Sequence, residues 1–445
     1  MNASFDTLLT LVKEKRFHAL INALDSMNAV DIAEFLDTLD NTQLLLVFRT
    51  LKKDISAEIF SELSQESKSH IVNMATDTEL AHIIEELYVD DAVDMLEEMP
   101  ASIVKRCLKA ANPETRALLN QFLKYPEDSA GSIMTAEFID LRKTMTVEQA
   151  IAHIRETGLD KETVYVCYVI DATRKLEGVV TFRDLLFARP DQPLKEIMNT
   201  DVIFSGTFDD REETVRKLTR YNFLALPIVD AERRLVGIVT FDDAIDVIEE
   251  EATEDFSKMA AITPLSESYM KTGILSLAKS RALWLLLLMI SSMITSVILE
   301  KYEAAFSAVP LLVSFIPMIT GTGGNAGSQS STMAIRGIAL REIALKDWYK
   351  VLFKETSISL IVGSTLCIVN FVRLLIMYPG QLGVTIVVTL TMLGTVLIAN
   401  AIGGILPILA KALGADPAIM AAPLITTFVD ALSLLIYFSI ASAIL

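Results

Sequence analysis

One carboxylate lies inside a long apolar segment near the end of the chain. Asp430 stands in the run PLITTFVDALSLL. A carboxylate near the middle of a membrane costs about 2.5–3.5 kcal/mol on insertion scales, so such a residue usually faces a water-filled path or a partner. Thr426 lies one helical turn earlier on the same face, and Pro423, just upstream, is expected to kink the helix. The pattern indicates a cation site, and pairing of Asp430 with Arg373 or with a serine or threonine for helix packing is the alternative.

The polar groups around this segment offer only oxygen. No His or Cys is suitably placed, and the side-chain candidates are Asp430, Thr426, Thr427, Asn325 and Gln329. Oxygen ligands favour Mg²⁺ or Ca²⁺ over zinc or copper, and Mg²⁺ keeps several waters and needs only one or two carboxylates. One aspartate per chain makes a poor site, whereas two around a two-fold axis make a better one. The sequence therefore predicts a homodimer whose pore lies on that axis.

A second concentration of carboxylates lies in FDDAIDVIEEEATEDFSKM at 241–259. Its acids are Asp242, Asp243, Asp246, Glu249, Glu250, Glu251, Glu254 and Asp255. Its apolar residues recur at helical spacing, at Ile245, Ile248, Ala252, Phe256 and Met259. Like charges three and four residues apart destabilise a helix, and bound cations would relieve the repulsion. A solvated acidic face is the alternative. A smaller acidic cluster comprises Asp90, Asp91, Asp94, Glu97 and Glu98.

The elements that carry these residues fall into two unlike parts. Of the 445 residues, the first 270 hold 28 Lys/Arg and 50 Asp/Glu, whereas residues 271–445 hold 11 and 7. An acidic surface repels phosphate, which argues against nucleic acid as a partner. Three scattered cysteines suit a reducing compartment, and we expect no signal peptide. No Ser-His-Asp set or phosphate-binding loop supports an enzyme.

The apolar part has five stretches long enough to cross a bilayer, which takes about 20 residues each. They are 282–299, 304–333, 356–378, 382–410 and 417–445. The second contains GTGGNAGSQSS at 321–331, where we expect a helix end that lines a pathway, with a loop outside the membrane as the alternative. Lys and Arg concentrate before the first stretch and between the second and third. This bias predicts a multi-pass protein of the plasma (inner) membrane, with the N-terminus in the cytosol and the C-terminus outside.

The acidic part contains an internal repeat. VIDATRKLEGVVTFRDLL at 169–186 aligns with IVDAERRLVGIVTFDDAI at 228–245, an offset of 59 residues. Each copy predicts strand, turn, strand and helix, and a helical pattern precedes each, at 146–157 and 209–221. Before the repeat, apolar residues at three and four spacing predict only helices over 1–125. Short stretches at 31–39, 54–63, 80–86 and 91–98 indicate a small superhelical stack.

The repeat resembles a pair of cystathionine-β-synthase (CBS) domains, which usually sense ligands and often bind adenine nucleotides such as ATP. Arg183 and Asp184 match the usual ribose-contacting position, and Phe223 matches a base-contacting one. The second copy has Asp242 where the first has Arg183, and a carboxylate there disfavours phosphate. A nucleotide site and the absence of one both stay open.

The whole chain resembles the MgtE family of magnesium channels. The order of parts and the motifs YPEDSAGSIMT, GTGGNAGSQ, GADPAIMAAPL and TTFVD all match. The resemblance implies a multidomain membrane protein with an all-α cytosolic N domain, tandem α/β CBS modules, an acidic plug helix and a five-helix transmembrane domain. The expected boundaries are 1–128, 129–198, 199–245, 246–270 and 271–445.

The resemblance also implies a homodimer that takes up Mg²⁺, with Asp430 as the pore aspartate and the Thr426 carbonyl beside it. Cytosolic Mg²⁺ would bridge the N domain, the CBS pair and the plug helix, and would close the pore. The implied regulatory ligands are Asp90, Asp94, Glu212, Asp243, Asp246, Glu251, Glu254, Asp255 and Asp416. Asn222 stands where an acid is expected, so we expect one regulatory site to be weaker or lost.

Two alternative functions stay open at the level of sequence. One is a secondary transporter that couples Mg²⁺ to protons, with Asp430 titrating. The other is a membrane-bound CBS sensor without transport. A dependence of flux on the pH gradient at fixed voltage would select the first alternative.

Overall fold

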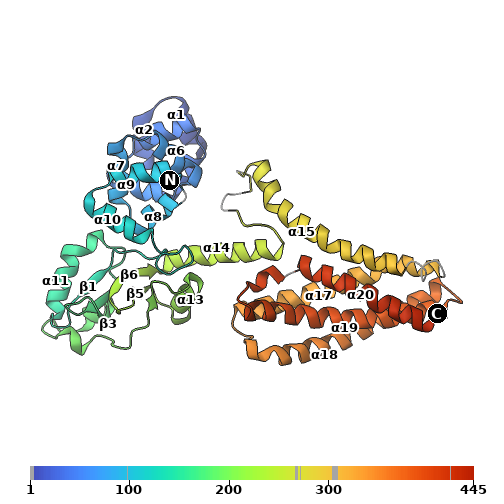
Figure 1. Cartoon of the computed structure of the whole chain (residues 1–445). Coiled ribbons are helices and arrows are strands. Elements are labelled where there is room, and N and C mark those ends of the chain that lie inside the picture. The colour runs from blue at the N-terminus through green and yellow to red at the C-terminus, as the bar shows by residue number, and fades with distance from the viewer. Residues whose placement is uncertain (1–4, 98, 266–268, 271, 303–308, 421) are drawn as a thin grey trace. The chain divides into compact units, whose positions relative to one another are not determined.

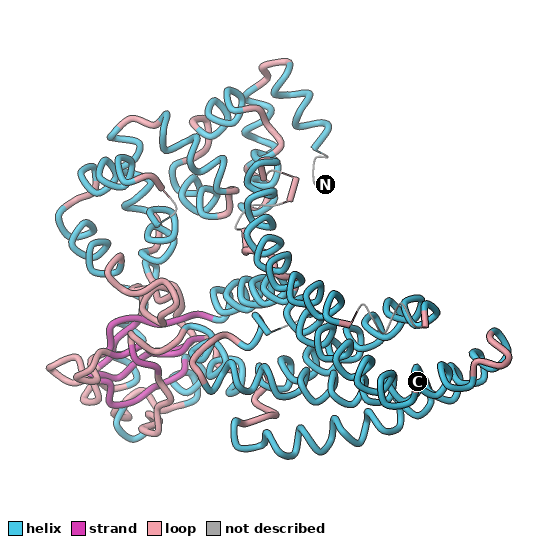
Figure 2. Tube along the Cα trace, turned by 45° about the vertical axis from the view of Figure 1, so that its right-hand side comes forward, coloured by secondary structure: helices cyan, strands magenta, loops and turns pink. Residues whose placement is uncertain are grey.

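The computed structural model describes residues 5–97, 99–265, 269–270, 272–302, 309–420 and 422–445. The chain divides into two compact units, Met1–Glu249 and Glu250–Leu445. Among the described residues, strands occur only in the first unit, and Figure 2 shows them gathered in one region of a largely helical chain. The predicted fold class, with a helical N domain, an α/β repeat and a helical C-terminal part, is confirmed.

Short helices form the N-terminal part of the first unit (Figure 1). Their bounds are α1 Phe5–Lys13, α2 Phe17–Leu24, α3 Ala29–Asp37, α4 Asn41–Phe48, α5 Lys53–Ser61, α6 Gln65–Met74, α7 Asp77–Glu86, α8 Val89–Glu97, α9 Ala101–Ala110 and α10 Pro113–Phe122. Their apolar faces meet in one core, in which Leu20, Phe35, Leu36, Val93 and Leu96 are almost completely buried. Burial of such faces, rather than intrinsic propensity, stabilises helices this short.

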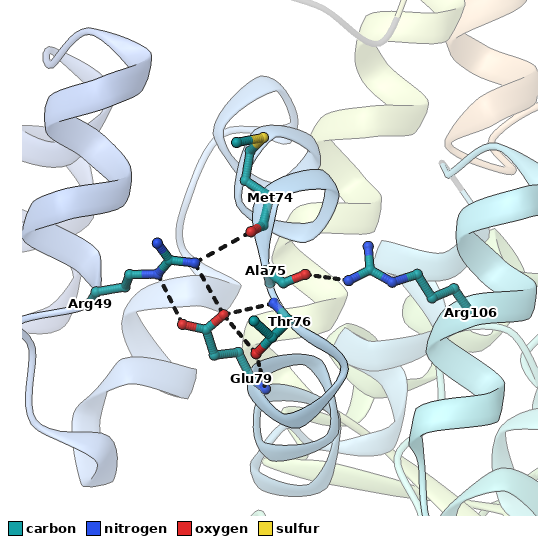
Figure 3. Close-up of polar contacts among 6 residues, drawn as sticks. All are labelled: Arg49, Met74, Ala75, Thr76, Glu79 and Arg106. Carbon is teal, nitrogen blue, oxygen red and sulfur yellow. Dashed lines mark hydrogen bonds and ion pairs between the residues drawn. The ribbon is translucent and has the colours of Figure 1, made fainter.

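Two arginines at neighbouring helices donate hydrogen bonds to carbonyl groups at the C-terminal end of α6 (Figure 3). Arg49, which follows α4, donates to the two Glu79 carboxylate oxygens at 2.9 and 3.2 Å and to the Met74 carbonyl at 3.3 Å. Arg106 of α9 donates to the Ala75 carbonyl. Carbonyl groups at a helix C-terminus lack partners within the helix. The two guanidinium groups satisfy them and thereby join α4, α6, α7 and α9.

The two copies of the repeat fold as two three-stranded modules. The first contains β1 Ile139–Leu141, α11 Val147–Thr157, η1 Gly158–Asp160, β2 Val166–Ile170, β3 Leu176–Thr181, α12 Phe182–Phe187 and η2 Leu194–Glu196. The second contains β4 Ser205–Gly206, α13 Arg211–Tyr221, β5 Ala225–Val229 and β6 Leu235–Thr240. In each sheet the first strand runs parallel to the second, and the third runs antiparallel to it. The predicted order of strand, turn, strand and helix is confirmed in both copies.

The turn between the two longer strands has the same backbone in both modules. Arg174 and Arg233 adopt φ angles of 67° and 66°, a left-handed conformation that is uncommon for a residue with a side chain. Asp171 Oδ1 accepts hydrogen bonds from two backbone N–H groups of its turn at 2.7 and 2.9 Å, and Asp230 Oδ1 does the same at 2.9 and 2.8 Å. The repeated Asp-Ala-x-Arg motif therefore fixes a turn, and these aspartates are already occupied.

The helix after the second module is far longer than its counterpart. α14 Phe241–Met259 has 19 residues, whereas α12 has 6. Pro190 follows α12, and a residue before proline avoids the helical conformation; the aligned position in the second copy is Glu249, which allows the helix to continue. On α14, Ala244 is fully buried, whereas Ile245 and Ile248 are 48% and 46% exposed. The regular apolar spacing therefore marks a solvent-facing stripe.

The second unit consists mainly of long helices. Their bounds are α15 Ile274–Lys301, α17 Ile316–Ala339, α18 Trp348–Met377, α19 Leu382–Ala412 and α20 Ala422–Ile444, with short turns η3 Pro310–Phe315, η4 Leu345–Asp347 and η5 Pro417–Met420. Figure 1 shows α17 and α20 alongside α19, with α18 on the other side of α19. In the part that the structure describes, four helices are long and apolar enough to cross a membrane. α17 is the fifth long helix, so the five-span count stays a prediction.

The glycine-rich run lies inside α17, so both the expected helix end and the alternative loop are wrong. A Cβ on Gly323 would lie 2.5 Å from Thr395 Cγ2 of α19 and 2.8 Å from Val429 Cγ1 of α20. A Cβ on Gly403 of α19 would lie 2.3 Å from the Gly327 carbonyl oxygen. Small residues in membrane helices let backbones approach closely. The glycines of α17 therefore allow close packing against the two neighbouring helices.

Candidate functional site

The carboxylate of Asp430 lies on α20 and is half-buried. Among the described residues it makes no hydrogen bond or ion pair. Arg373 instead donates to Asn370 Oδ1 at 3.1 Å and to Met318 Sδ at 3.2 Å. The alternative in which Arg373 pairs with Asp430 is therefore wrong. The membrane helix presents a carboxylate without a protein partner in the described chain.

The turn before Asp430 lies against the glycine-rich helix. Thr426 Oγ1 and Thr427 Oγ1 both donate to the Pro423 carbonyl, at 2.9 and 3.1 Å. Pro423, expected to kink the helix, instead lies in its first turn, where no backbone N–H is needed. A Cβ on Gly324 would lie 2.9 Å from Thr426 Cγ2, so α17 contacts α20 one turn from Asp430. Asn325 and Gln329, the other oxygen candidates of α17, are exposed on the single chain.

Carboxylates from three elements approach one another in the first unit. Asp90 and Asp91 lie on α8, Glu162 follows η1, and Asp243 lies in the first turn of α14. Burial and then mutual repulsion raise the pKa of Asp90 well above its usual range, with Asp243 the strongest neighbour. Burial, opposed in part by Lys68, raises the pKa of Asp91 to about 6. Burial and the negative charge of Asp243 raise the pKa of Glu162 to about 7.

Two oxygens of this group have no partner. Asp90 Oδ1 and Glu162 Oε2 are shielded from solvent and make no hydrogen bond with any residue that the structure describes. A buried, unpaired carboxylate is costly, and it is relieved by a proton or a cation. We call Asp90, Asp91, Glu162 and Asp243 the inner carboxylate group.

Asp243 is oriented by its own helix. Thr240 donates to Asp243 Oδ2 through its hydroxyl group and, at 3.4 Å, through its backbone N–H. Asp184 has the same place in the first module, where the Thr181 hydroxyl and N–H donate to its Oδ2 at 2.6 and 2.9 Å. Each aspartate thus lies in the first turn of the helix that follows the third strand of its module and accepts hydrogen bonds from the threonine just before that helix. One Asp243 oxygen remains to face the other acids.

The other candidate regulatory ligands are spread over α8, α13 and α14. Glu212 forms an ion pair with Arg216 on α13, and Asp94 and Asp246 are exposed on α8 and α14. Glu251 and Asp255 lie half-buried in the second half of α14. In the chain as described, no group of three or more His, Cys, Asp or Glu side chains is arranged to hold a metal ion.

A mixed-charge group lies in the second unit. Lys258 of α14 forms ion pairs with Glu254 and with Asp416, which precedes η5. Burial lowers the pKa of Lys258, but the hydrogen bonds to Asp416 and Glu254 outweigh it, so the net pKa is raised. We call Glu254, Lys258 and Asp416 the lysine-bridged group.

The three candidate nucleotide-binding residues have different environments in the structure. Arg183 is exposed at the start of α12, and the Asp184 carboxylate is used in the cap described above. Phe223 is half-buried and stacks on Tyr221 with ring centres 5.5 Å apart. Asn222, which stands between these two residues in the sequence, follows α13 as its C-cap with φ of 53°, a left-handed conformation that asparagine tolerates well. The position therefore has a conformational reason to be asparagine.

Two residues of these groups escaped the sequence analysis. Glu162 lies between the repeat motifs, and no local pattern connects it with α8 or α14. Lys258 could have been found, because Glu254 and Lys258 are four residues apart on one helix, which is the spacing of an intrahelical ion pair. Its contact with Asp416, 158 residues further along the chain, is visible only in the fold.

Three family models match the chain. Residues 316–440 match a divalent cation transporter model, MgtE; residues 27–128 match the MgtE intracellular N domain; and residues 130–191 and 194–250 match the CBS domain. The magnesium transporter MgtE of Thermus thermophilus is 37% identical over 443 residues, which cover 99% of this chain and 98% of that protein. The magnesium transporter MgtE of Bacillus subtilis is 31% identical over 450 residues, with coverage of 99% and 98%.

Solved structures match the first unit. The cytosolic domain of the Mg²⁺ channel MgtE in complex with ATP is 37% identical, with a TM-score of 0.52, and covers 55% of this chain and 99% of that one. The soluble part of a magnesium transporter is 29% identical, with a TM-score of 0.53, and covers 56% and 98%.

Proposed function

Because the chain belongs to the MgtE family of magnesium transporters, we propose that its membrane part is a Mg²⁺-selective channel for magnesium uptake, with Asp430 as the pore carboxylate. The observation that carries the proposal is the half-buried Asp430 on a membrane helix, without a hydrogen bond or ion pair among the described residues. Such a carboxylate is costly unless water or a cation meets it. Thr426, one turn away, supplies further oxygen.

The pore is proposed to lie between two copies of the chain. A single aspartate leaves most of a Mg²⁺ hydration shell without protein contact, whereas two related by a two-fold axis contact it from both sides. The exposed amides Asn325 and Gln329, and the exposed apolar stripe of Ile245 and Ile248, are surfaces that a second copy would cover. In this arrangement five helices cross the plasma membrane, with the N-terminus in the cytosol and the C-terminus outside.

Cytosolic Mg²⁺ is proposed to close the channel. The inner carboxylate group joins α8 of the N domain to α14, and its unpaired oxygens favour a bound cation. Mg²⁺ that binds there stabilises the arrangement that brings the acids together, and the pore closes if that arrangement binds Mg²⁺ more tightly than the open one. The further regulatory ligands proposed are Asp94, Glu212, Asp246, Glu251, Glu254, Asp255 and Asp416.

The pore assignment is tested by Mg²⁺ uptake into liposomes. Asp430→Ala is expected to abolish the flux without loss of folding, because the cation loses the carboxylate proposed to bind it in the pore. Glu342→Gln is the matched control, since Glu342 is an exposed acid of the same unit outside the apolar segments. Wild-type flux in the Asp430→Ala protein would contradict the assignment.

The unpaired carboxylate also suits a proton-coupled transporter, in which Asp430 binds a proton on one side of the membrane. Flux that depends on the pH gradient at fixed voltage would select this second candidate. Flux that follows the Mg²⁺ electrochemical gradient and stops as internal Mg²⁺ rises would select the channel.

ATP is proposed as a ligand of the CBS pair. The proposal is supported by the 37% identical cytosolic domain solved with ATP and by the exposed position of Arg183 at the start of α12. Calorimetric titration should show ATP binding that is lost in Arg183→Ala and in Phe223→Ala. Binding retained in both variants would place the nucleotide elsewhere.

A further inference from the structure

A lysine of the acidic helix lies between two of the proposed Mg²⁺ ligands. Lys258 Nζ is 2.5 Å from Glu254 Oε1 and 2.7 Å from Asp416 Oδ2. The three side chains are 25%, 35% and 31% exposed, so solvent screens these pairs only in part. The ammonium therefore fills the place between the two carboxylates where a bridging cation would lie.

Asp416 connects this group to the pore helix. Its Oδ2 accepts from Lys258, while its Oδ1 accepts a backbone N–H of η5 at 2.8 Å. The far end of η5 is held as well, because Ser331 of α17 donates to the Met420 carbonyl at 2.8 Å. Since η5 leads into α20, a change at Asp416 reaches the helix of Asp430 through one short turn.

We propose that the Lys258 ammonium is a built-in cation that occupies the Glu254–Asp416 site in place of Mg²⁺. The proposal rests on the magnesium-gated channel proposed above and changes one part of it, since Lys258 balances one of the two negative charges of this site before any metal binds. Each contact is a charge-assisted hydrogen bond, which is about twice as strong as a neutral one. A Mg²⁺ ion would have to displace Lys258 before it could bridge the same two carboxylates.

The built-in cation sets the Mg²⁺ concentration that closes the pore. With Lys258 in place, the end of α14 stays attached to η5 when Mg²⁺ is low, so fewer ions are needed to complete the closed state. Without it, Glu254 and Asp416 repel each other and Mg²⁺ must first neutralise them.

The pair itself is tested without transport, by thermal unfolding of the full chain in detergent with EDTA. Lys258→Met and Asp416→Asn should each lower the unfolding temperature, and the double variant should lose less than the sum of the two, because both remove the same contact. Lys258→Arg should restore most of the loss. If Asp416 acts only as a Mg²⁺ ligand, neither single variant loses stability in EDTA. That result, or losses that simply add, would overturn the proposal.

The effect on gating is tested by uptake into liposomes with stepped internal Mg²⁺. Lys258→Met should raise the half-closing Mg²⁺ concentration about threefold or more, as for the loss of a partly screened ion pair. Lys411→Met is the matched control, because Lys411 is an exposed lysine near Asp416 that makes no side-chain hydrogen bond or ion pair among the described residues. An unchanged value in Lys258→Met, or an equal shift in Lys411→Met, would overturn the proposal. If the wild type fails to close, the proposed gating fails, and the unfolding experiment still decides whether Lys258 occupies the site.

Discussion

Acidic helix α14 contributes to two carboxylate groups, and they differ in how their charge is balanced. At its start, Asp243 faces Asp90 and Glu162, and no described lysine or arginine forms an ion pair with these three acids. At its end, Glu254 and Asp416 share the Lys258 ammonium at 2.5 and 2.7 Å. The inner carboxylate group is therefore expected to respond to protons and added cations, whereas Lys258 already balances one of the two negative charges in the lysine-bridged group.

This difference shows that a count of acids does not identify a metal site. Each group contains two carboxylates that the family resemblance assigns to Mg²⁺ regulation, Asp90 and Asp243 in the first and Glu254 and Asp416 in the second. Only the first has buried oxygens without a partner, so only there does a bound cation replace an unfavourable state rather than a salt bridge. A ligand shifts the equilibrium between two states only by the difference between its binding free energies for them. We therefore expect Mg²⁺ to act mainly through the inner carboxylate group.

The difference between the two groups should disappear when the inner carboxylate group is given a lysine of its own. Glu162→Lys reverses one charge among Asp90, Asp91 and Asp243, and should raise the Mg²⁺-free stability of the full chain by about 1–3 kcal/mol, since it pairs a buried acid that was unpaired. Added Mg²⁺ should then stabilise the variant much less than the wild type. Thermal unfolding with EDTA and with millimolar Mg²⁺ measures both effects.

Glu156→Lys is the control for that charge reversal, because Glu156 is an exposed acid on α11 of the same module. It should leave both unfolding temperatures nearly unchanged. If Glu162→Lys behaves like Glu156→Lys, or if its response to Mg²⁺ stays at the wild-type level, the inner carboxylate group is not a cation-responsive site.

A substitution with a smaller expected effect removes the charge of Asp243 but keeps its hydrogen bond with Thr240. Asp243→Asn keeps a side-chain oxygen for Thr240 but removes one negative charge, so it should raise Mg²⁺-free stability by about 1 kcal/mol and reduce the gain from Mg²⁺. Asp184→Asn makes the same change at the equivalent cap of α12, where the carboxylate is exposed. It should have little effect, because the asparagine oxygen still accepts from Thr181 and the charge that is removed is exposed. Equal effects at the two positions would assign the result to capping alone.

Sequence patterns predicted the fold well where local chemistry decides it. The 59-residue repeat predicted both modules, and the apolar periodicity predicted the helices of the N domain. The glycine-rich run misled, because glycine serves both as a helix breaker and as a contact residue between helices. Inside α17 it serves the second role, and only the neighbours Thr395 and Val429 reveal that.

The candidate site was predictable in its members but not in its charge balance. Asp430 stands out in an apolar segment, and the acids of α14 stand out as a run. Whether each acid is paired depends on residues far away in the chain: Glu162 joins Asp90 and Asp243 through the packing of three elements, and Lys258 reaches Asp416 across 158 residues. No local pattern predicts either contact, so the distinction between a group without a basic partner and a group that contains a lysine required the fold.

The mildest way to sharpen the comparison is to change pH. The acids Asp90, Asp91, Glu162 and Asp243 have pKa values raised by burial and by their neighbours, which include Glu137 and Asp242 and, with opposite sign, Lys68. For acids with raised native pKa values, the native state binds more protons than the unfolded one, so stability falls as pH rises. Because the pKa is about 6 for Asp91 and about 7 for Glu162, the loss begins near the ordinary carboxyl pKa of about 4 and ends near pH 8, and its last part, between pH 6 and 8, comes mainly from Glu162. In EDTA, unfolding temperature should therefore be higher at pH 6 than at pH 8, and Mg²⁺ should stabilise the chain more at pH 8.

Two variants test the origin of this pH response. Glu162→Lys should reduce both the pH dependence of the unfolding temperature and the larger effect of Mg²⁺ at pH 8, whereas Lys258→Met should leave both unchanged. A pH response that survives in Glu162→Lys would show that it does not come from the inner carboxylate group.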